Sequence, residues 1–450
     1  MKNYILVGCL AALALMGCKK YLDAKPDKAL ATLATLVDMQ ALLDDNLRLN
    51  TQTVYAAEVA ADDYYLKDAA MAAISPEGDK RIYNWEKGNQ FEGAGDGWYY
   101  TYSPVYYGNV VLENIINLKR DAGNAKEWDN IKGQAYFYKG IAMLFGAAVW
   151  APAYDEATAK NTLGLPIRAS SDFNVVSKRA SVAETYGQLL SDLKQAAQLL
   201  PVSQVHVMRP SKIAAYAIIS RAYLMMNKYQ EAGLYADSAL KLNNVLVDYN
   251  DLNTAAANAF TAYKGEVLAH FSIANPAILS QSNAVVVPEL YQLYQPDDLR
   301  KNIFYKSVGT NLYAFKGSYS GGNALFFGPA VDEMYLNRAE CYARLNKLSE
   351  ALNDLNNLMR KRWNKNKVYV PYASSDKEQV INDILLERRK ELLMRGLRWG
   401  DLKRLNKLGY NLTVKRSYNA NQAVLLPNDS RYVMSLPEAV LENSGMQQNP

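Results

Sequence analysis

Cysteine and histidine are scarce in this chain, with three and two residues respectively. Cys9 lies in an apolar N-terminal run and Cys18 lies just after it, so Cys341 alone remains and no internal disulfide is expected. A catalytic cysteine would need a base, and only His206 and His270 could supply one. We therefore expect Cys341, in a helical setting, to be a buried structural thiol. We expect no metal or other cofactor.

An excess of charge of one sign is also missing. The formal net charge is +5, and Lys and Arg are mixed with Asp and Glu without a basic block. Nucleic acid is therefore not an expected partner. Hydrophobic residues make up 50% of the chain and charged residues 21%, as in ordinary globular proteins.

Long hydrophobic runs are absent too, and the N-terminal one is short. The segment 5–16 gives about 12 mostly apolar residues after Lys2, whereas a spanning helix needs ~20. A basic start followed by a short apolar run is typical of a secretory signal. The sequence Leu15-Met16-Gly17-Cys18 matches the bacterial lipobox. It predicts a signal peptide over residues 1–17 and a lipid anchor on Cys18, which tethers the mature chain to a membrane.

Tyrosine, in contrast, is abundant, with 33 residues beside 6 tryptophans. A tyrosine ring has a flat apolar face and a polar tip, which suits amphipathic ligands such as sugars. Packing between helices is the other use of these rings, and for any single tyrosine we favour packing.

Apolar residues recur at three- and four-residue spacings over several segments, which predicts helices. The strongest such segments are 30–49, 98–116, 131–149, 181–200 and 376–408. At the start of the segment 181–200, Ser181 and Glu184 have the spacing of a capping box. We predict loops over residues 52–96 and 150–178, and a polar, extended C-terminal tail. We predict a loop-rich insertion over residues 244–328. An insertion of that length is usually functional.

An internal repeat flanks this insertion. The segment 223–232 aligns with 342–351 at a constant offset, with Asn227-Lys228 matching Asn346-Lys347. Each copy has the form of a helix–turn–helix of the tetratricopeptide type. We therefore predict an all-α fold of stacked helical hairpins.

Several motifs together resemble the SusD/RagB family of outer-membrane lipoproteins. They are Cys18-x-x-x-Leu22-Asp23-x-x-Pro26, Asn337-Arg338-Ala339-Glu340, Glu387-Arg388-Arg389-Lys390-Glu391-Leu392, Gly396-Leu397-Arg398-Trp399 with Asp401-Leu402-Lys403-Arg404, and the closing Gln448-Asn449-Pro450. The resemblance implies one domain over residues 18–450, built on tetratricopeptide-like hairpins with a loop-rich ligand face. It implies a lipid-anchored protein on the extracellular side of the outer membrane. It also implies a SusC-type TonB-dependent transporter as partner and an oligosaccharide ligand that is bound without conversion. Peptides or other nutrients are alternative ligands.

The resemblance implies that the ligand face comes from the loop before Trp98 and from the insertion. No ligand motif of the family matches residue by residue, so local chemistry guides the choice. The candidates are Trp85, Tyr64, Tyr65 and Asn89 from the loop, and Tyr313, Phe315 and Tyr319 from the insertion. Trp85 could instead be packed under its loop, and we expect Trp98, Trp150 and Trp399 to lie in the core.

Two other classes of function remain open. Asp62-Asp63 and Asp297-Asp298 could be imagined as glycosidase carboxylates, but such pairs are usually turn or cap residues, and catalysis needs two carboxyls across a cleft. The run Glu387–Glu391 is interpreted as a salt-bridged helix face. A helical-repeat adaptor that binds only protein shares the same scaffold, and the aromatic loops favour a glycan-binding protein over it.

Overall fold

The structure, a computed structural model, describes residues 33–92, 97–273, 276–418 and 421–450. It is rich in helices. They are α3 (Leu36–Leu43), α4 (Asn46–Leu49), α5 (Ala56–Ala60), α6 (Asp68–Ala73), α7 (Glu77–Tyr83), α8 (Gly97–Ile115), α9 (Ala125–Trp150), α10 (Val182–Leu199), α11 (Lys212–Met225), α12 (Tyr229–Leu242), α13 (Pro288–Gln292), α14 (Arg300–Ile303), α15 (Val331–Arg344), α16 (Leu348–Arg360), α17 (Lys377–Glu391), α18 (Arg398–Lys407) and α19 (Glu438–Ser444). Short 3-10 helices are η1 (Tyr249–Asp251), η2 (Ala277–Leu279) and η3 (Ser430–Tyr432).

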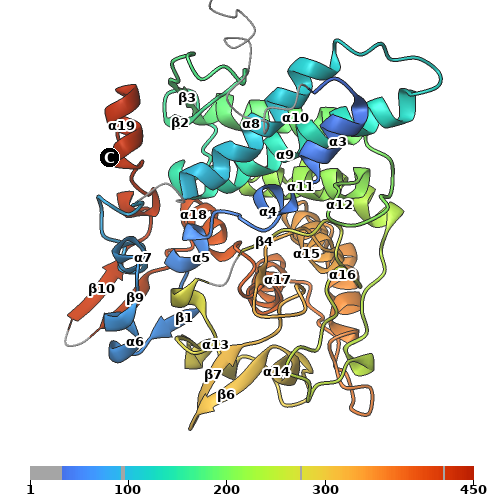
Figure 1. The fold of residues 1–450 in the computed structure, drawn as a ribbon. Helices are drawn as coiled ribbons and strands as arrows, with labels where there is room; N and C mark the ends of the chain where they lie inside the picture. The colour runs from blue at the N-terminus through green and yellow to red at the C-terminus, as the bar shows by residue number, and fades with distance from the viewer. Residues whose placement is uncertain (1–32, 93–96, 274–275, 419–420) are drawn as a thin grey trace, which may run out of the picture.

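Helices that follow one another along the chain pack side by side. α8 packs on α9, α9 on α10, α10 on α11 and α11 on α12, and α12 then packs on α15, which contacts α16 and α17. Figure 1 shows α8, α9 and α10 together at the top and α15, α16 and α17 below them. The predicted helical scaffold is therefore confirmed.

The two copies of the repeat form equivalent helical hairpins that meet in space. Asn227 and Asn346 each end a helix with positive φ, 57° and 64°. In both copies the following lysine N–H donates to the tyrosine carbonyl five residues back, at 2.9 and 2.8 Å, which satisfies a free carbonyl at the helix end. α12 of the first copy packs against α15 of the second, and a Cβ on Gly233 would lie 3.0 Å from Cys341 Cβ. The close crossing buries Cys341, as expected, and burial raises the pKa of its thiol.

Short antiparallel strand pairs supplement the helices, so the fold is not strictly all-α. The pairs are β1 (Tyr64–Leu66) with β5 (Ala284–Val286), β2 (Leu163–Pro166) with β3 (Arg179–Ser181), β4 (Ser272–Ile273) with β8 (Leu325–Phe326), β6 (Tyr305–Gly309) with β7 (Leu312–Phe315), and β9 (Val414–Tyr418) with β10 (Asn421–Leu425). The β1–β5 pair places Tyr64 opposite Val286 and so joins the segment before α8 to the insertion.

Several segments differ from the sequence prediction. The segment 30–49 was predicted to be one helix, but its described part contains α3 and α4, which are separated at Asp44 and Asp45. Residues 52–96 were predicted to be irregular, but α5, β1, α6 and α7 lie there. The segment 376–408 is two helices, because Met394 and Gly396 adopt positive φ between α17 and α18. The C-terminal tail was predicted to be extended, but it contains α19, which stands at the left edge of Figure 1.

A network of buried ion pairs surrounds α17. Arg300 contacts Glu387 at 2.6 Å and Glu391 at 2.9 Å, and Arg362 contacts Glu391 at 2.7 Å. The run Glu387–Glu391 is therefore salt-bridged, as predicted, but these pairs lie inside the protein. Such pairs are costly to break, because an unpaired partner would stay buried.

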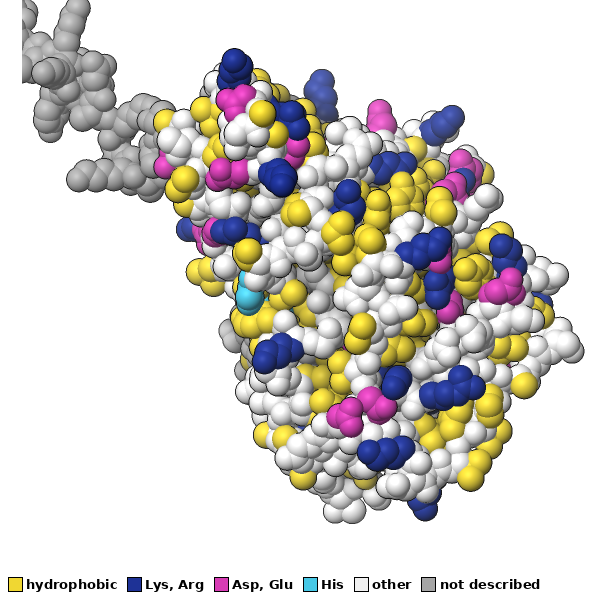
Figure 2. Space-filling model, turned by 90° about the vertical axis from the view of Figure 1, so that its right-hand side faces the viewer, with side chains coloured by type: hydrophobic (Ala, Val, Ile, Leu, Met, Phe, Trp, Pro, Cys, Tyr) yellow, Lys and Arg dark blue, Asp and Glu magenta, His cyan; other side chains and the backbone are white. Residues whose placement is uncertain are grey.

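On one outer face, Lys and Arg are interspersed with Asp and Glu and with apolar side chains, as Figure 2 shows. Within the described part of the chain, no helix has both the length and the hydropathy to cross a membrane. The predicted signal peptide and Cys18 lie outside the described residues.

Candidate functional site

The candidates from the segment before α8 are mostly packed inside. Trp85 is 2% exposed and donates its indole N–H to Ala60 O at 3.0 Å, so it is packed under its loop. Tyr64 is 1% exposed and donates to Val59 O at 2.9 Å. Arg416 lies between these rings, 4.9 Å from the Trp85 ring and 5.3 Å from the Tyr64 ring. Neither ring presents a free face to a ligand. Tyr65 is half-buried and Asn89 is exposed.

The candidates from the insertion divide in the same way. Phe315 and Tyr319 are 7% and 6% exposed, and the Tyr319 hydroxyl lies 3.0 Å from Asp332 in the interior. Tyr313 is half-buried at the surface, and its ring stacks on Tyr291 with centroids 3.6 Å apart. Tyr313, Tyr65 and Asn89 are thus the predicted contacts that a ligand could reach.

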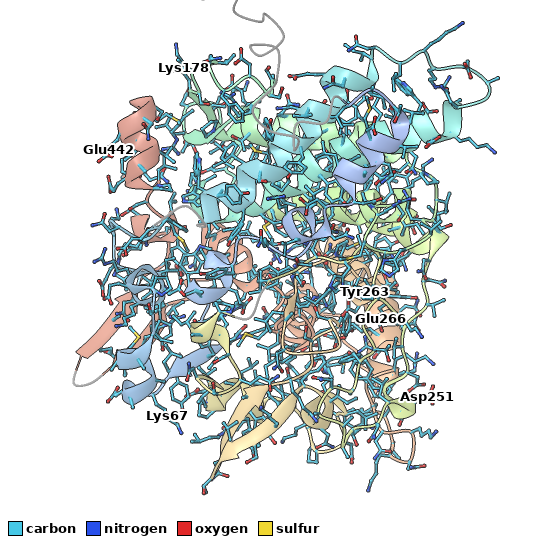
Figure 3. The ribbon with its side chains drawn as sticks, viewed as in Figure 1. Lys67, Lys178, Asp251, Tyr263, Glu266 and Glu442 are labelled. Carbon is cyan, nitrogen blue, oxygen red and sulfur yellow. The ribbon has the colours of Figure 1, made fainter. Side chains whose placement is uncertain are left out.

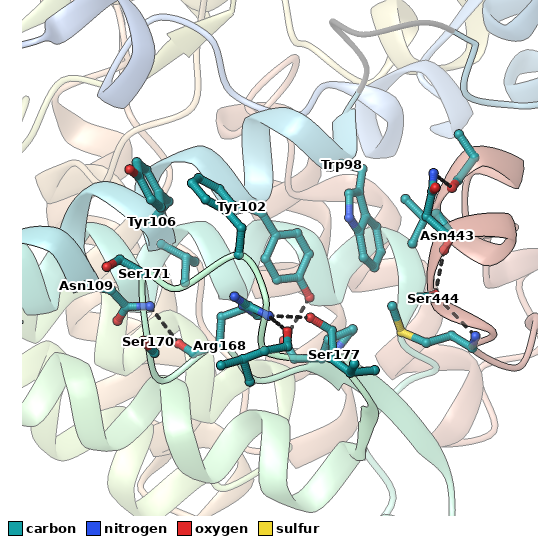
Figure 4. A pocket seen from close by; sticks show the side chains of 18 residues that line it. Trp98, Tyr102, Tyr106, Asn109, Arg168, Ser170, Ser171, Ser177, Asn443 and Ser444 are labelled. Atoms are coloured by element: carbon teal, nitrogen blue, oxygen red, sulfur yellow. Dashed lines mark hydrogen bonds between the residues drawn. The ribbon is translucent and has the colours of Figure 1, made fainter. Parts of the chain in front are cut away.

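A large open cavity of about 480 Å³ lies elsewhere, between α8, the loop 168–177 and α19 (Figure 4). We call it the aromatic cleft. Its lining residues are Trp98, Tyr102, Val105, Tyr106, Asn109, Pro166, Arg168, Ser170, Ser171, Phe173, Val175, Val176, Ser177, Ala439, Val440, Asn443, Ser444 and Met446.

The floor of the aromatic cleft is one face of α8. Trp98, Tyr102 and Tyr106 repeat at four-residue spacing, so their rings lie above one another on the helix. The rings of Trp98 and Tyr102 are 4.7 Å apart. The opposite side of α8 is held tightly to the core, since a Cβ on Gly97 would come within 2.6 Å of Val54 Cγ2. This packing fixes the direction in which the rings project.

The loop 168–177 forms the second wall and is braced from within. The Arg168 guanidinium donates to Ser177 Oγ at 2.9 Å and also to the carbonyls of Asp172 and Val175. Asn109, which is 1% exposed, donates to Arg168 O at 3.0 Å. The brace leaves Phe173 78% exposed, and its ring stacks on Tyr106 with centroids 4.9 Å apart.

A carboxylate also holds this loop. Glu113 accepts from Ser171 N at 2.8 Å and from the Ser171 hydroxyl. Burial alone would raise the pKa of Glu113, but the hydrogen bonds from Ser171 outweigh it and lower this pKa. Glu113 is therefore ionised at neutral pH and acts as an acceptor for the loop.

The third wall is α19 with the residues that follow it. Ala439, Val440 and Asn443 line the cleft from this helix, which buries none of its own residues. A clasp holds its base, because Leu436 N donates to Gln448 Oε1 at 2.6 Å and Gln448 Nε2 donates to Leu436 O at 3.0 Å. Lys178 and Glu442, labelled in Figure 3, lie beside these two walls.

The lining suits a ligand with apolar faces and polar edges. Flat rings can stack on the C–H face of a sugar, while Ser, Asn and Arg groups can bind its hydroxyls. Among the described lining residues none is Asp or Glu. Three of the four aspartates considered for catalysis are held in ion pairs elsewhere: Asp62 with Arg398 at 2.6 Å, Asp63 with Arg389 at 2.8 Å, and Asp298 with Arg300 at 2.7 Å.

The sequence prediction missed this cleft. Trp98 was expected in the core, whereas it is half-buried and lines the cleft; Trp150 and Trp399, both fully buried, are in the core as expected. Two signals could have revealed it. Six aromatic residues crowd positions 98–107, more than one helix face can bury. Phe173, Val175 and Val176 place apolar side chains in a predicted loop.

Fold and cleft together define a helical scaffold protein with an open, ring-lined binding surface. Comparison with known families makes the class specific. A family described as "Starch-binding associating with outer membrane" matches residues 20–224, and the family described as "SusD family" matches residues 332–450. Both matches are to families of SusD type, so the chain is similar to SusD/RagB proteins in its N-terminal and in its C-terminal part.

Individual relatives agree with this assignment. "SusD-like protein P2" of Formosa agariphila is 24% identical over 247 residues, which cover 52% of this chain and 45% of that protein, so the match spans about half of the relative's length. A protein of Bacteroides vulgatus described as sugar-binding has a similar fold, with a TM-score of 0.76 and 21% identity over 93% of this chain and 99% of that one. A SusD superfamily protein of Bacteroides thetaiotaomicron gives a TM-score of 0.75 and 21% identity over 92% and 100%.

Proposed function

We propose that this protein binds carbohydrate without converting it. The observation that carries the proposal is the aromatic cleft, in which Trp98, Tyr102, Tyr106 and Phe173 line an open cavity with neutral polar groups and Arg168 at its edges. Stacking rings supply contact area, and the polar edges orient hydroxyls. The starch-binding description of the matched family and the sugar-binding description of the structural neighbour support the same ligand class.

The setting of this activity is the outer membrane. We propose that Cys18 carries the lipid, that residues 18–450 form one domain with hairpins of the tetratricopeptide type, and that the protein serves a SusC-type TonB-dependent transporter from the extracellular side. A shallow cleft gives modest affinity for a short glycan. Tethering at the mouth of a transporter would convert that modest affinity into retention through high local concentration.

Tyr65, Asn89 and Tyr313 stay in the proposal as further ligand contacts on a separate surface. Trp85, Tyr64, Phe315 and Tyr319 are buried, so we assign them a structural role.

Affinity gel electrophoresis tests the function and separates the two surfaces. Residues 19–450 would be run against a panel of soluble polysaccharides beside Phe173→Ala, Tyr313→Ala and the control Val368→Ala, whose side chain is 83% exposed in another loop. We expect one glycan to retard the protein and Phe173→Ala to relieve the retardation. Relief by Tyr313→Ala alone would move the site to the insertion. Retardation by no glycan would contradict carbohydrate binding, and release of reducing ends would contradict the non-enzymatic role.

A further inference from the structure

A second cavity also has a volume of about 480 Å³. Residues 447–450 line it, directly after the part of the C-terminal segment that lines the aromatic cleft. It is formed by the loop after α9, by α18, by residues 428–433 and by the chain end at 447–450. We call it the lysine pocket, because Lys403 and Lys407 line it. Most of its other lining side chains are amides or hydroxyls, and it contains one aromatic ring, Tyr432.

Lys403 is the unusual group in this pocket. It is 6% exposed and donates from Nζ to Ala148 O at 2.9 Å and to Ala151 O, at the C-terminal end of α9. An ammonium has three N–H groups, so these two acceptors leave one unused. Among the described residues, the partners of Lys403 Nζ are these two carbonyls, and no ion pair joins it to a carboxylate. The carbonyls at the C-terminal end of α9 offset part of the cost of burying this cation, and a bound anion would offset more of it.

The other charges around the pocket are already paired. Lys407 contacts Asp155 at 3.4 Å. Asp429 is the one acidic side chain among the described lining residues, and Arg431 binds both of its oxygens, at 3.0 and 2.8 Å. Lys87, at the rim, donates to Ser430 Oγ at 2.9 Å and to the Pro450 carbonyl. Among the described residues around the pocket, Lys403 is thus the positive charge that is paired with carbonyls at the end of α9 and with no carboxylate.

Neutral polar groups stand around this charge. Asn161 and Asn428 are exposed on opposite segments of the lining, and the Tyr432 hydroxyl accepts from Asn406 Nδ2 at 3.2 Å, which leaves its own proton for another acceptor. Amides both donate and accept, so they can bind hydroxyl groups in either sense.

We propose that the lysine pocket binds a sugar acid, with the carboxylate on Lys403 and the hydroxyls on the surrounding amides. This is a second ligand site and does not depend on the aromatic cleft. The pocket lacks the stacked rings of the cleft, so charge and hydrogen bonds replace ring contact as the source of affinity.

Proton linkage gives the proposal a distinct signature. Burial lowers the pKa of Lys403 to about 7, so at pH 8 most of the amine is neutral. A carboxylate beside it favours the protonated form, so binding at pH 8 takes up a proton. The affinity for the sugar acid should therefore fall by about tenfold for each pH unit above pH 8.

Isothermal titration of residues 19–450 with glucuronate, glucose and acetate tests the proposal. Glucuronate and glucose differ only in the carboxylate, and acetate has the carboxylate without the sugar. We expect glucuronate to bind about tenfold or more tightly than either. Repeating the titration at pH 8 in buffers of different ionisation enthalpy should show net proton uptake.

Two variants assign the site. Lys403→Met should abolish the preference for glucuronate over glucose and the proton uptake. Because this change also removes a cap from α9, a second variant, Asn161→Ala, alters only an exposed side chain and should weaken glucuronate binding several-fold. Val368→Ala is the control. Equal affinity for glucose and glucuronate, equal affinity for acetate and glucuronate, or no binding of glucuronate would overturn the proposal. Loss of glucuronate binding in Phe173→Ala would assign the ligand to the aromatic cleft and overturn it as well.

Discussion

The aromatic cleft and the lysine pocket have the same volume and share the C-terminal segment, yet their linings differ in kind. Four rings and one arginine line the first, whereas one ring, two lysines and many amides line the second. In the cleft, Arg168 is fixed by its own loop, while in the pocket Lys403 is buried without a carboxylate. The difference teaches that cavity size does not define the ligand: ring faces favour neutral sugars, and a buried cation that is paired with carbonyls alone favours an anion.

The largest expected effect concerns the charge that separates the two cavities. The pKa of Lys403 is lowered from 10.5 to about 7, so between these pH values the unfolded chain binds a proton that the folded chain lacks. The free energy of unfolding therefore rises with pH across this window. One pKa unit corresponds to about 1.4 kcal/mol, so a pKa lowered from 10.5 to about 7 predicts a rise of about 5 kcal/mol.

Urea denaturation at several pH values between 7 and 10.5 measures this contribution. Other groups titrate in the same range, so the quantity of interest is the difference between the wild-type protein and Lys403→Met. The wild-type protein should gain stability relative to the variant as pH rises. If the difference in the free energy of unfolding between the two proteins stays constant over this pH range, Lys403 is charged throughout. The electrostatic contrast between the lysine pocket and the aromatic cleft would then not hold.

The next largest effect concerns the stacked rings of the aromatic cleft. Tyr106 and Phe173 stack on each other from α8 and from the loop, so each ring supports the other. Removal of both should weaken glycan binding by about 2 kcal/mol, or about thirtyfold in Kd. In a double-mutant cycle the coupling between Tyr106→Ala and Phe173→Ala should be about 0.5 to 1.5 kcal/mol. Glucuronate affinity should not change, and additive single effects would argue against a shared stacking platform.

How far the sequence predicts these features depends on whether they are local. The helix from Val182 was predictable because its capping box is formed within four residues: Glu184 N donates to Ser181 Oγ at 3.1 Å, and Ser181 N donates to Glu184 Oε2 at 2.7 Å. The hairpin turns at Asn227 and Asn346 were predictable for the same reason. The short helices α5 to α7 were not, because contacts such as the β1–β5 pair, distant in sequence, stabilise them.

The site was harder to predict than the fold for the same physical reason. Whether a ring is buried depends on distant chain segments, and Arg416 covers Trp85 while α19 leaves Trp98 open to the cleft. Local composition identifies an aromatic segment, but it cannot tell which rings the later chain covers. Of the seven predicted contacts, only Tyr65, Asn89 and Tyr313 keep surface that a ligand could reach.

A smaller effect should follow from loosening one wall of the cleft. Arg168 holds the loop through Ser177 and the carbonyls of Asp172 and Val175. Arg168→Met removes these bonds, so the loop must be ordered on binding, and we expect glycan affinity to fall about tenfold. Arg168→Lys keeps the charge but cannot make the same fork. If the loop brace matters, Arg168→Lys should resemble Arg168→Met; full affinity in Arg168→Lys would instead assign the effect to charge.

The smallest predicted effect concerns the C-terminal segment, because this segment lines both cavities. Gln448 clasps Leu436 with two hydrogen bonds, at 2.6 and 3.0 Å, and so fixes α19 on one side and the lining of the lysine pocket on the other. Without these bonds the C-terminal segment must be ordered when a ligand binds. Gln448→Ala should therefore weaken binding by about 1 kcal/mol, because each such bond contributes only modestly. Both glycan and glucuronate affinities should then fall together by roughly threefold to fivefold. Glu442→Ala, with an exposed side chain on α19 that lines neither cavity, is the matched control. Loss of affinity for one ligand alone would mean that α19 and the chain end move independently, and the two cavities would then be separate sites rather than two sides of one segment.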